Sequence, residues 1–334
     1  MTLEQRIQAW IQLGNELRSK AIDYEEITTK TQYYNQWFTK ENILISIAGI
    51  CKLLEEKSLR KWVSGYNLEN IPSKKIGVVM AGNIPCVGFH DMLCVTLAGH
   101  ELHAKKSSDD PIFPELIINR LIEIEPQFKN KIQWRERMHD IEAIIATGTN
   151  NSAMHFNYYF SKIPRIIRKN RTSIAIITGN ETKEDLQNLG KDVFTYFGLG
   201  CRNVSKLLVP QGYKFDSLFE ALYPYHTFVN HKKYINNYEY QRAIYLMNST
   251  EFLDNNFLII KQDEGLHSPV GVLYHQSYTN SDDILDFINK WKDKIQCIVL
   301  AKPTEGQVKM GETQFPEVNQ YADNVDTMKF LTSL

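Results

Sequence analysis

A cysteine in a glycine-containing segment is the residue of this chain best suited to covalent chemistry. Cys201 lies in the run Phe197-Gly198-Leu199-Gly200-Cys201-Arg202-Asn203, after a segment typical of a helix. The two glycines leave little side-chain bulk around the sulfur, so a carbonyl compound has a path to it. A helix terminus and the adjacent Arg202 would both favour the thiolate, which is the form that attacks carbonyls. We therefore interpret Cys201 as a candidate nucleophile; a small buried thiol is the alternative.

Polar residues and glycines follow three expected strands that precede this cysteine. The segments are Met80–Pro85, His103–Asp110 and Thr147–Asn151. Ligands of open α/β sheets gather at the carboxyl ends of strands, so the last of these loops is suited to a phosphate or a ribose. Asn83, in the first, displays an amide after a buried strand, although a turn residue near a proline would also explain it. No GxGxxG follows an expected strand, so a nicotinamide cofactor would need another binding geometry.

The overall composition argues against nucleic acid as the main partner. The 334 residues allow two domains, and 38 Lys and Arg nearly balance 39 Asp and Glu. One basic run, Arg165–Arg171, could bind a phosphate-rich ligand, and a solvated basic turn before a strand is the alternative.

The cysteines and the amino-terminal segment predict a cytoplasmic protein. The five cysteines are scattered without CxxC spacing, so we expect reduced thiols and no metal site. The first 20 residues have amphipathic periodicity but no apolar core of signal-peptide length. No later stretch approaches the length of a membrane span.

Hydrophobic periodicity predicts an α/β protein with two parallel-sheet domains. Residues 1–70 have helical spacing and suggest two or three surface helices. Short apolar runs then alternate with helical segments, as in βαβ units. Expected strands are 76–80, 101–105, 141–146, 173–178, 206–209, 257–261, 270–274 and 297–300, and expected helices are 87–98, 111–124, 183–197, 215–222 and 282–291. The tail from 302 has no strong period and is typical of an arm that packs on another domain or subunit.

Six segments in a fixed order give the chain a resemblance to a known family. They are GNIPCVGFHDMLCVTLAGH, KKSSDD, ATGTNNSA, RKNRTS, GLGCRNVSK and YADNVDT. Over roughly residues 75–330 the chain resembles the LuxC-type acyl-CoA reductases, the fatty-acid reductases of the aldehyde dehydrogenase superfamily. The resemblance implies an aldehyde dehydrogenase-like fold. We expect an N-terminal helical region (1–72) packed on a nucleotide-binding domain (73–172), a catalytic domain (173–303) and a C-terminal arm (304–334).

The resemblance also implies roles for individual residues. Cys201 would take the acyl group from a thioester, and the amide of Asn83 would form the oxyanion hole with the backbone N–H of Cys201. The cofactor-binding residues carried over from the family are Lys105 and Ser107 at the adenosine ribose, Thr147, Gly148 and Thr149 at the pyrophosphate, and Glu264 near the nicotinamide ribose. Glu264 is one residue out of register with the family pattern. No metal is implied.

Three further residues or segments bear on the cofactor and the reaction. Lys106 stands where the superfamily commonly has proline, and an extra cation there would suit a 2′-phosphate, so NADPH is favoured over NADH; a solvated charge is the alternative. His267 would protonate a leaving thiolate or would be structural. The glutamate with which hydrolytic aldehyde dehydrogenases activate water has no clear counterpart near Ile177–Asn180.

The sequence therefore predicts NADPH-dependent reduction of a fatty acyl thioester to the aldehyde through an acyl-cysteine. The substrate would be an acyl-CoA or an acyl carrier. A homo-oligomer is expected, with a place in a multi-enzyme fatty-acid reductase complex. The alternatives are an aldehyde dehydrogenase working in the oxidative direction, CoA-acylating or hydrolytic, and a non-catalytic subunit of a reductase complex.

Overall fold

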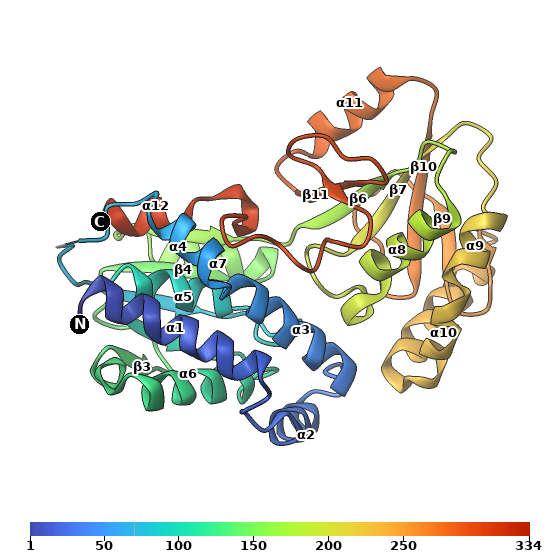
Figure 1. Ribbon diagram of the computed structural model, residues 1–334. Coiled ribbons are helices and arrows are strands. Elements are labelled where there is room, and N and C mark those ends of the chain that lie inside the picture. Colours follow the sequence, from blue (N-terminus) through green and yellow to red (C-terminus); the bar gives the residue numbers. More distant parts are fainter. Residues whose placement is uncertain (70) are drawn as a thin grey trace. The chain divides into compact units, whose positions relative to one another are not determined.

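The computed structural model describes residues 1–69 and 71–334, which form two compact α/β units (Figure 1). Unit 1 comprises Met1–Asn170 and Pro316–Leu334, and unit 2 comprises Arg171–Phe315. Each unit is built around its own sheet of mainly parallel strands. The expected fold class is therefore confirmed.

The described residues of unit 1 contain a five-stranded parallel sheet in the order β3-β2-β1-β4-β5. Its strands are β1 (Lys75–Val79), β2 (Glu101–Lys105), β3 (Ile132–Trp134), β4 (Ala143–Thr147) and β5 (Arg165–Arg168). The central strands are apolar and buried, as expected of parallel strands covered on both faces. The sequence predicted β1, β2 and β4 but not the three-residue β3. The alternative of a solvated basic turn over Arg165–Arg171 holds only for its last three residues, which precede β6, because Arg165–Arg168 form strand β5.

Helices surround this sheet (Figure 1). They are α1 (Leu3–Arg18), α2 (Tyr24–Tyr34), α3 (Lys40–Leu53), α4 (Glu56–Val63), α5 (Phe89–Leu97), α6 (Phe113–Ile124), η1 (Pro126–Asn130), α7 (Asn150–Tyr159), η4 (Ala322–Asn324) and α12 (Thr327–Thr332). Residues 1–69 thus form four helices where two or three were predicted. Trp10 of α1 is fully buried, packs edge-on against Phe89 and donates its indole N–H to Thr96 Oγ1 (3.1 Å). The N-terminal helices therefore contribute to the core of unit 1.

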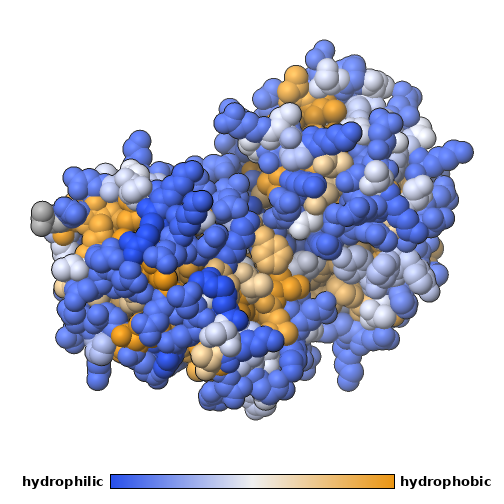
Figure 2. Space-filling model, viewed as in Figure 1, coloured by the Kyte–Doolittle hydropathy of each residue, from blue (hydrophilic) through white to orange (hydrophobic). Residues whose placement is uncertain are grey.

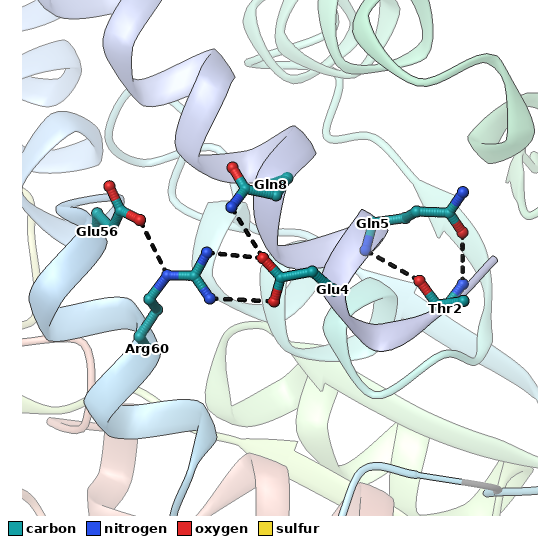
Figure 3. Close-up of polar contacts among 6 residues, drawn as sticks. All are labelled: Thr2, Glu4, Gln5, Gln8, Glu56 and Arg60. Atoms are coloured by element: carbon teal, nitrogen blue, oxygen red, sulfur yellow. Dashed lines mark hydrogen bonds and ion pairs between the residues drawn. The ribbon is translucent and has the colours of Figure 1, made fainter.

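The start of α1 shows how local contacts fix these helices (Figure 3). Thr2 and Gln5 form a capping box, in which the N–H of each donates to the side chain of the other. Glu4 accepts two hydrogen bonds from Arg60 of α4, at 2.8 and 3.1 Å. Hydrogen bonding to Arg60 lowers the pKa of Glu4 to about 2. The pair joins α1 to α4, and its exposure keeps its contribution to stability small.

Unit 2, all of which is described, contains a seven-stranded sheet in the order β12-β11-β6-β7-β10-β9-β8. The strands are β6 (Thr172–Ile176), β7 (Val204–Pro210), β8 (Leu253–Asp254), β9 (Ile259–Gln262), β10 (Val272–Tyr278), β11 (Ile295–Leu300) and β12 (Val308–Lys309). All pairs are parallel except β8 with β9. The helices are α8 (Lys183–Phe194), η2 (Thr195–Gly198), α9 (Asp216–Leu222), η3 (Tyr223–Asn230), α10 (Lys232–Met247) and α11 (Ser281–Trp291).

The residues that follow β11 are divided between the two units. Strand β12 extends the sheet of unit 2, and the chain enters unit 1 at Pro316. There the Trp62 indole donates to the Tyr321 hydroxyl (2.8 Å), and a ring nitrogen of His100 lies 3.0 Å from the carbonyl of Leu331.

The surface visible in Figure 2 is mostly hydrophilic, with apolar side chains in smaller patches. Among the described residues, no helix is both long and apolar enough to cross a membrane.

Candidate functional site

Most of the predicted cofactor residues lie at one edge of the unit 1 sheet. Strands β2, β1 and β4 are adjacent and parallel, so their carboxyl ends leave the sheet at the same edge. The residues placed there are Asn83 after β1, Lys105 and Ser107 at and after β2, and Thr147, Gly148 and Thr149 at and after β4. A Cβ built on Gly82 would clash with the side chain of Ser107, so the Asn83 loop and the Ser107 loop are in close contact.

The loop after β4 begins a helix whose first turn is suited to an anion. Thr147 is the last residue of β4, and Thr149 is the N-cap of α7, where its Oγ1 accepts from the N–H of Ser152 (3.1 Å). A Cβ on Gly148 would lie 2.8 Å from Ser152 Cβ, so glycine lets the loop approach the helix. The first turn of α7 holds no acidic residue. Its positive dipole end and its N–H groups can therefore receive a phosphate.

The two lysines at the end of β2, Lys105 within it and Lys106 just after it, are already engaged by the protein. Lys105 Nζ donates to the carbonyl of Glu136 at 2.6 Å. Lys106 forms an ion pair with Glu115 of α6, and its Nζ lies 5.2 Å from the centroid of the Trp134 ring. The expectation that Lys106 supplies an extra cation is not supported by these contacts, because Glu115 balances its charge.

Two arginines beside these lysines were missed by the sequence analysis. Arg135 and Arg137 follow β3, are exposed, and have no polar side-chain partner among the described residues. The backbone N–H of Arg135 donates to the carbonyl of Ala104 in β2 (2.8 Å), which places this loop next to Lys105. The sequence signal that could have placed these arginines was weak, because β3, the strand that precedes them, is only three residues long. Once β3 is known, the arginines lie at the carboxyl end of an edge strand of this sheet.

A buried carboxyl group ties the Asn83 loop to the segment after β2. Asp110 accepts a hydrogen bond from the backbone N–H of Cys86 at 2.6 Å. Burial raises the pKa of Asp110 from 3.8 to about 6. The free-energy cost of burying Asp110 is therefore smallest when its carboxyl group is protonated.

Asp110 predicts a pH dependence of stability. Because the pKa of Asp110 is higher in the folded state than in the unfolded state, protonated Asp110 contributes fully to the free energy of unfolding below about pH 4. This contribution is lost as the pH rises through about 6. The neutral Asp110→Asn variant should therefore gain stability relative to the wild type between pH 4 and 7, by up to about 3 kcal/mol. Urea unfolding across this range measures the difference. The exposed neighbour Asp109→Asn is the control, and a pH-independent difference for Asp110→Asn would contradict the prediction.

The candidate nucleophile lies in unit 2, on a strained connection between α8 and β7. The predicted helix 183–197 ends at Phe194, and Tyr196 and Phe197 both have positive φ, at 54° and 56°. Such conformations are costly for non-glycine residues and persist only where packing enforces them. The Phe197 ring stacks on His231, with centroids 4.4 Å apart. Cys201 follows this turn and is partly exposed.

Two effects expected to favour the Cys201 thiolate are not supported. Cys201 follows the carboxyl end of α8, whose dipole is negative, whereas an anion is stabilised at the amino end. Arg202 Nη1 donates to Cys297 Sγ and to the carbonyl of Thr313, both at 3.4 Å. The guanidinium therefore holds together β11 and the segment after β12.

The other cysteines are buried or have a thiol whose pKa is raised. Cys86, Cys94 and Cys297 are buried. Cys51 is partly exposed, but burial raises the pKa of its thiol. Exposure therefore favours Cys201 as the candidate nucleophile.

Glu264 and His267 lie in the loop between β9 and β10, and both are exposed. This loop contacts β7, because the hydroxyl of Ser205 donates to the carbonyl of Leu266 (3.0 Å) and Lys206 Nζ donates to the carbonyl of Asp263. No described contact links Glu264 or His267 to a catalytic partner. Their roles stay predictions. Among the described residues no group of three or more His, Cys, Asp or Glu could hold a metal ion.

Comparisons with known proteins bear on the fold. No protein-family model matches the chain, and no curated protein matches its sequence. An aldehyde dehydrogenase from Bacillus cereus, solved with NAD⁺, is 11% identical over 91% of this chain and 73% of its own, with a TM-score of 0.65. Aldehyde dehydrogenase 21 from Physcomitrella patens, solved with its product succinate, is 13% identical over 100% and 84% of the two chains (TM-score 0.69).

A third solved structure agrees with these two. The aldehyde dehydrogenase KauB from Pseudomonas aeruginosa is 11% identical over 91% of this chain and 73% of its own, with a TM-score of 0.70. Identities this low show a shared fold. The chain therefore has the fold of the aldehyde dehydrogenases, as the sequence resemblance predicted.

Proposed function

We propose that this protein reduces a fatty acyl thioester to the aldehyde with NADPH, through a covalent acyl group on Cys201. The observation that carries the proposal is the partly exposed Cys201 on a strained turn of unit 2, in a chain with an aldehyde dehydrogenase-like fold. The similar solved structures are aldehyde dehydrogenases, which supports chemistry on aldehydes. The six segments that resemble LuxC-type reductases support an acyl thioester as the substrate.

The reaction divides into two steps at the same sulfur. The Cys201 thiolate attacks the thioester carbonyl, a new C–S bond forms, and the bond to the leaving thiolate of CoA or carrier breaks. Hydride addition to the resulting thioester and loss of the Cys201 thiolate then give the aldehyde. We assign the Asn83 amide and the Cys201 backbone N–H to the oxygen that becomes negative in both steps. The leaving CoA thiolate takes a proton from His267, as predicted, or from water if His267 is structural.

The carboxyl edge of the unit 1 sheet fits a nicotinamide nucleotide. The neutral first turn of α7 and its N-cap Thr149 are suited to a pyrophosphate, and Lys105 and Ser107 lie two strands away at the same edge. When bound, the nucleotide would supply the hydride. The similar structures from Bacillus cereus and from Pseudomonas syringae were solved with NAD⁺, so the preference for NADPH rests on this chain's own residues.

Slow hydrolysis of the thioester between the acyl group and Cys201 is also part of the proposal. Glu181 directly follows Ile177–Asn180. Its carboxylate accepts from the backbone N–H and hydroxyl of Thr178 and from the N–H of Gly179, at 2.7, 2.8 and 3.0 Å. These three hydrogen bonds engage both carboxylate oxygens within its own turn, so Glu181 is not poised to activate a water molecule. An acyl group on Cys201 would therefore persist until hydride arrives.

The arginines after β3 predict the cofactor preference. The double variant Arg135→Ala/Arg137→Ala should weaken NADPH binding at least about tenfold and change NADH binding little, since a 2′-phosphate forms charge-assisted hydrogen bonds with arginine. Fluorescence titration with both nucleotides measures the effect. Lys129→Ala, a nearby exposed cation, is the control. Equal losses for both nucleotides would contradict the assignment of these arginines to the 2′-phosphate.

The function is tested with labelled long-chain acyl-CoA and no cofactor. Stoichiometric labelling of Cys201, followed by release of aldehyde on addition of NADPH, is the expected result. Rapid formation of free acid from aldehyde and NAD(P)⁺ would favour an oxidative dehydrogenase instead. If the protein is neither labelled nor binds nucleotide, the non-catalytic alternative is favoured.

A further inference from the structure

The peptide groups around Cys201 are organised by a buried asparagine two residues later. Asn203 is 1% exposed. Its Oδ1 accepts from the N–H of Gly200 (2.8 Å), and its own N–H donates to the carbonyl of Gly200 (3.0 Å). Its Nδ2 donates to the carbonyls of Asp192 (2.9 Å) and Thr195 (2.8 Å). One side chain thus binds both ends of the connection that carries Cys201.

These contacts determine where the Cys201 N–H points. The carbonyl of Gly200 and the N–H of Cys201 belong to one trans peptide group, so they point in opposite directions. The backbone N–H of Asn203 fixes the Gly200 carbonyl and with it the Cys201 N–H. The side chain holds this backbone turn in place, because it binds the Gly200 N–H and the carbonyls of residues 192 and 195. The next peptide group is held as well, because Ser173 Oγ donates to the carbonyl of Cys201 (3.1 Å). Both peptide groups that flank the sulfur-bearing residue are therefore restrained.

The same asparagine closes the strained turn. Its two Nδ2 hydrogen bonds reach the carbonyls of residues 192 and 195, on the α8 side of Tyr196 and Phe197. Strained backbone of this kind relaxes unless its surroundings over-determine it. Asp192 is itself anchored, since its carboxylate accepts from the N–H groups of Gly311 (2.6 Å) and Thr313 (3.1 Å). The connection is thus fixed to both α8 and the segment after β12.

We propose that Asn203 is a positioning residue for Cys201, which holds the Cys201 N–H and Sγ in the orientation that acyl transfer needs. This rests on the proposed function only in taking Cys201 as the nucleophile. Asn203 acts through the backbone and does not touch the substrate. Its removal should therefore slow the chemical step and leave substrate binding nearly unchanged.

The test compares Asn203→Asp with Ser173→Ala. Asn203→Asp keeps the acceptor for Gly200 and loses both donors, whereas Ser173→Ala removes the donor to the Cys201 carbonyl and, with it, the acceptor for the Cys297 N–H. For Asn203→Asp we expect kcat to fall about 100-fold with KM within about threefold, and we expect a shifted pH profile for alkylation of Cys201 by iodoacetamide. For Ser173→Ala we expect a smaller fall in kcat and a smaller shift of the pH profile for alkylation.

Asn255→Asp is the matched control. Asn255 Oδ1 also accepts two backbone N–H groups in unit 2, from Phe257 and Leu258, and its Nδ2 is buried. This variant introduces a comparable carboxylate and should leave the alkylation profile of Cys201 unchanged.

The outcomes test the positioning role of Asn203 separately from the proposed function. Wild-type kcat and alkylation profiles in folded Asn203→Asp, or a loss of stability alone, would overturn the positioning role. If Asn203→Asp does not fold, Ser173→Ala decides in the same way. Alkylation is measured without substrate, so it tests the positioning role even if the wild type is never labelled by acyl-CoA, a result that would overturn only the proposed function.

Discussion

Replacing Cys201 by serine is expected to lower the rate of aldehyde formation from acyl-CoA by about 10⁴-fold or more. The two side chains are nearly isosteric, so the turn that follows η2 should keep its shape. A serine hydroxyl stays protonated at neutral pH and is a much weaker nucleophile than a thiolate. The covalent step should therefore fail, while nucleotide binding in unit 1 should continue.

Single-turnover measurements with labelled acyl-CoA check this expectation. Cys51→Ser is the matched control, because Cys51 is the other partly exposed cysteine and its thiol has a raised pKa. Cys51→Ser should keep wild-type labelling, and Cys201→Ser should show none with unchanged NADPH affinity. Labelling that persists in Cys201→Ser would assign the acyl group to a different residue.

The sheet strands were predictable where an apolar run is buried on both faces. The run around Ile76–Met80 predicted β1 within one residue, and the predicted bounds of β2 match its observed range, Glu101–Lys105. Strand β5 was missed because an arginine stands at each of its ends. Helix α10 was missed because its main buried side chains, Tyr234, Tyr238 and Tyr245, combine with polar residues into a weak apolar period.

The candidate site was predictable only as far as strand ends determine it. Asn83 and the Thr147 loop follow parallel strands, so their common edge could be expected from the sequence. The partners of charged side chains could not be predicted in this way. Glu115 balances Lys106 from the next helix, and Arg202 reaches Cys297 and Thr313, about 100 residues further along the chain. Such pairings depend on how α6, β11 and the segment after β12 pack, which local patterns do not specify.

A large loss of stability is expected when Arg168 is replaced. This residue lies in the basic run for which the sequence suggested a phosphate ligand or a solvated turn. Arg168 and Asp91 are both 5% exposed and form an ion pair between β5 and α5. Arg168 Nη2 also donates to Thr327 Oγ1 of α12 (3.0 Å). Burial opposes the charge on Arg168, but Asp91 outweighs it and raises the pKa of the arginine. The pair therefore joins three elements of unit 1.

Arg168→Met should destabilise unit 1 by about 3–5 kcal/mol, because it leaves the Asp91 carboxylate buried without its partner. Urea unfolding followed by tryptophan fluorescence is a direct measurement, since Trp10, Trp62 and Trp134 all lie in this unit. Arg165→Met, an exposed arginine of the same strand, should change stability by less than about 0.5 kcal/mol.

A double variant then identifies the buried charge as the cause. Adding Asp91→Asn to Arg168→Met removes the buried carboxylate that has lost its partner, so the double variant should recover part of the lost stability at pH 7. If the loss of stability in Arg168→Met persists in full in the double variant, lost packing and the lost hydrogen bond to Thr327 account for it, and the buried carboxylate does not.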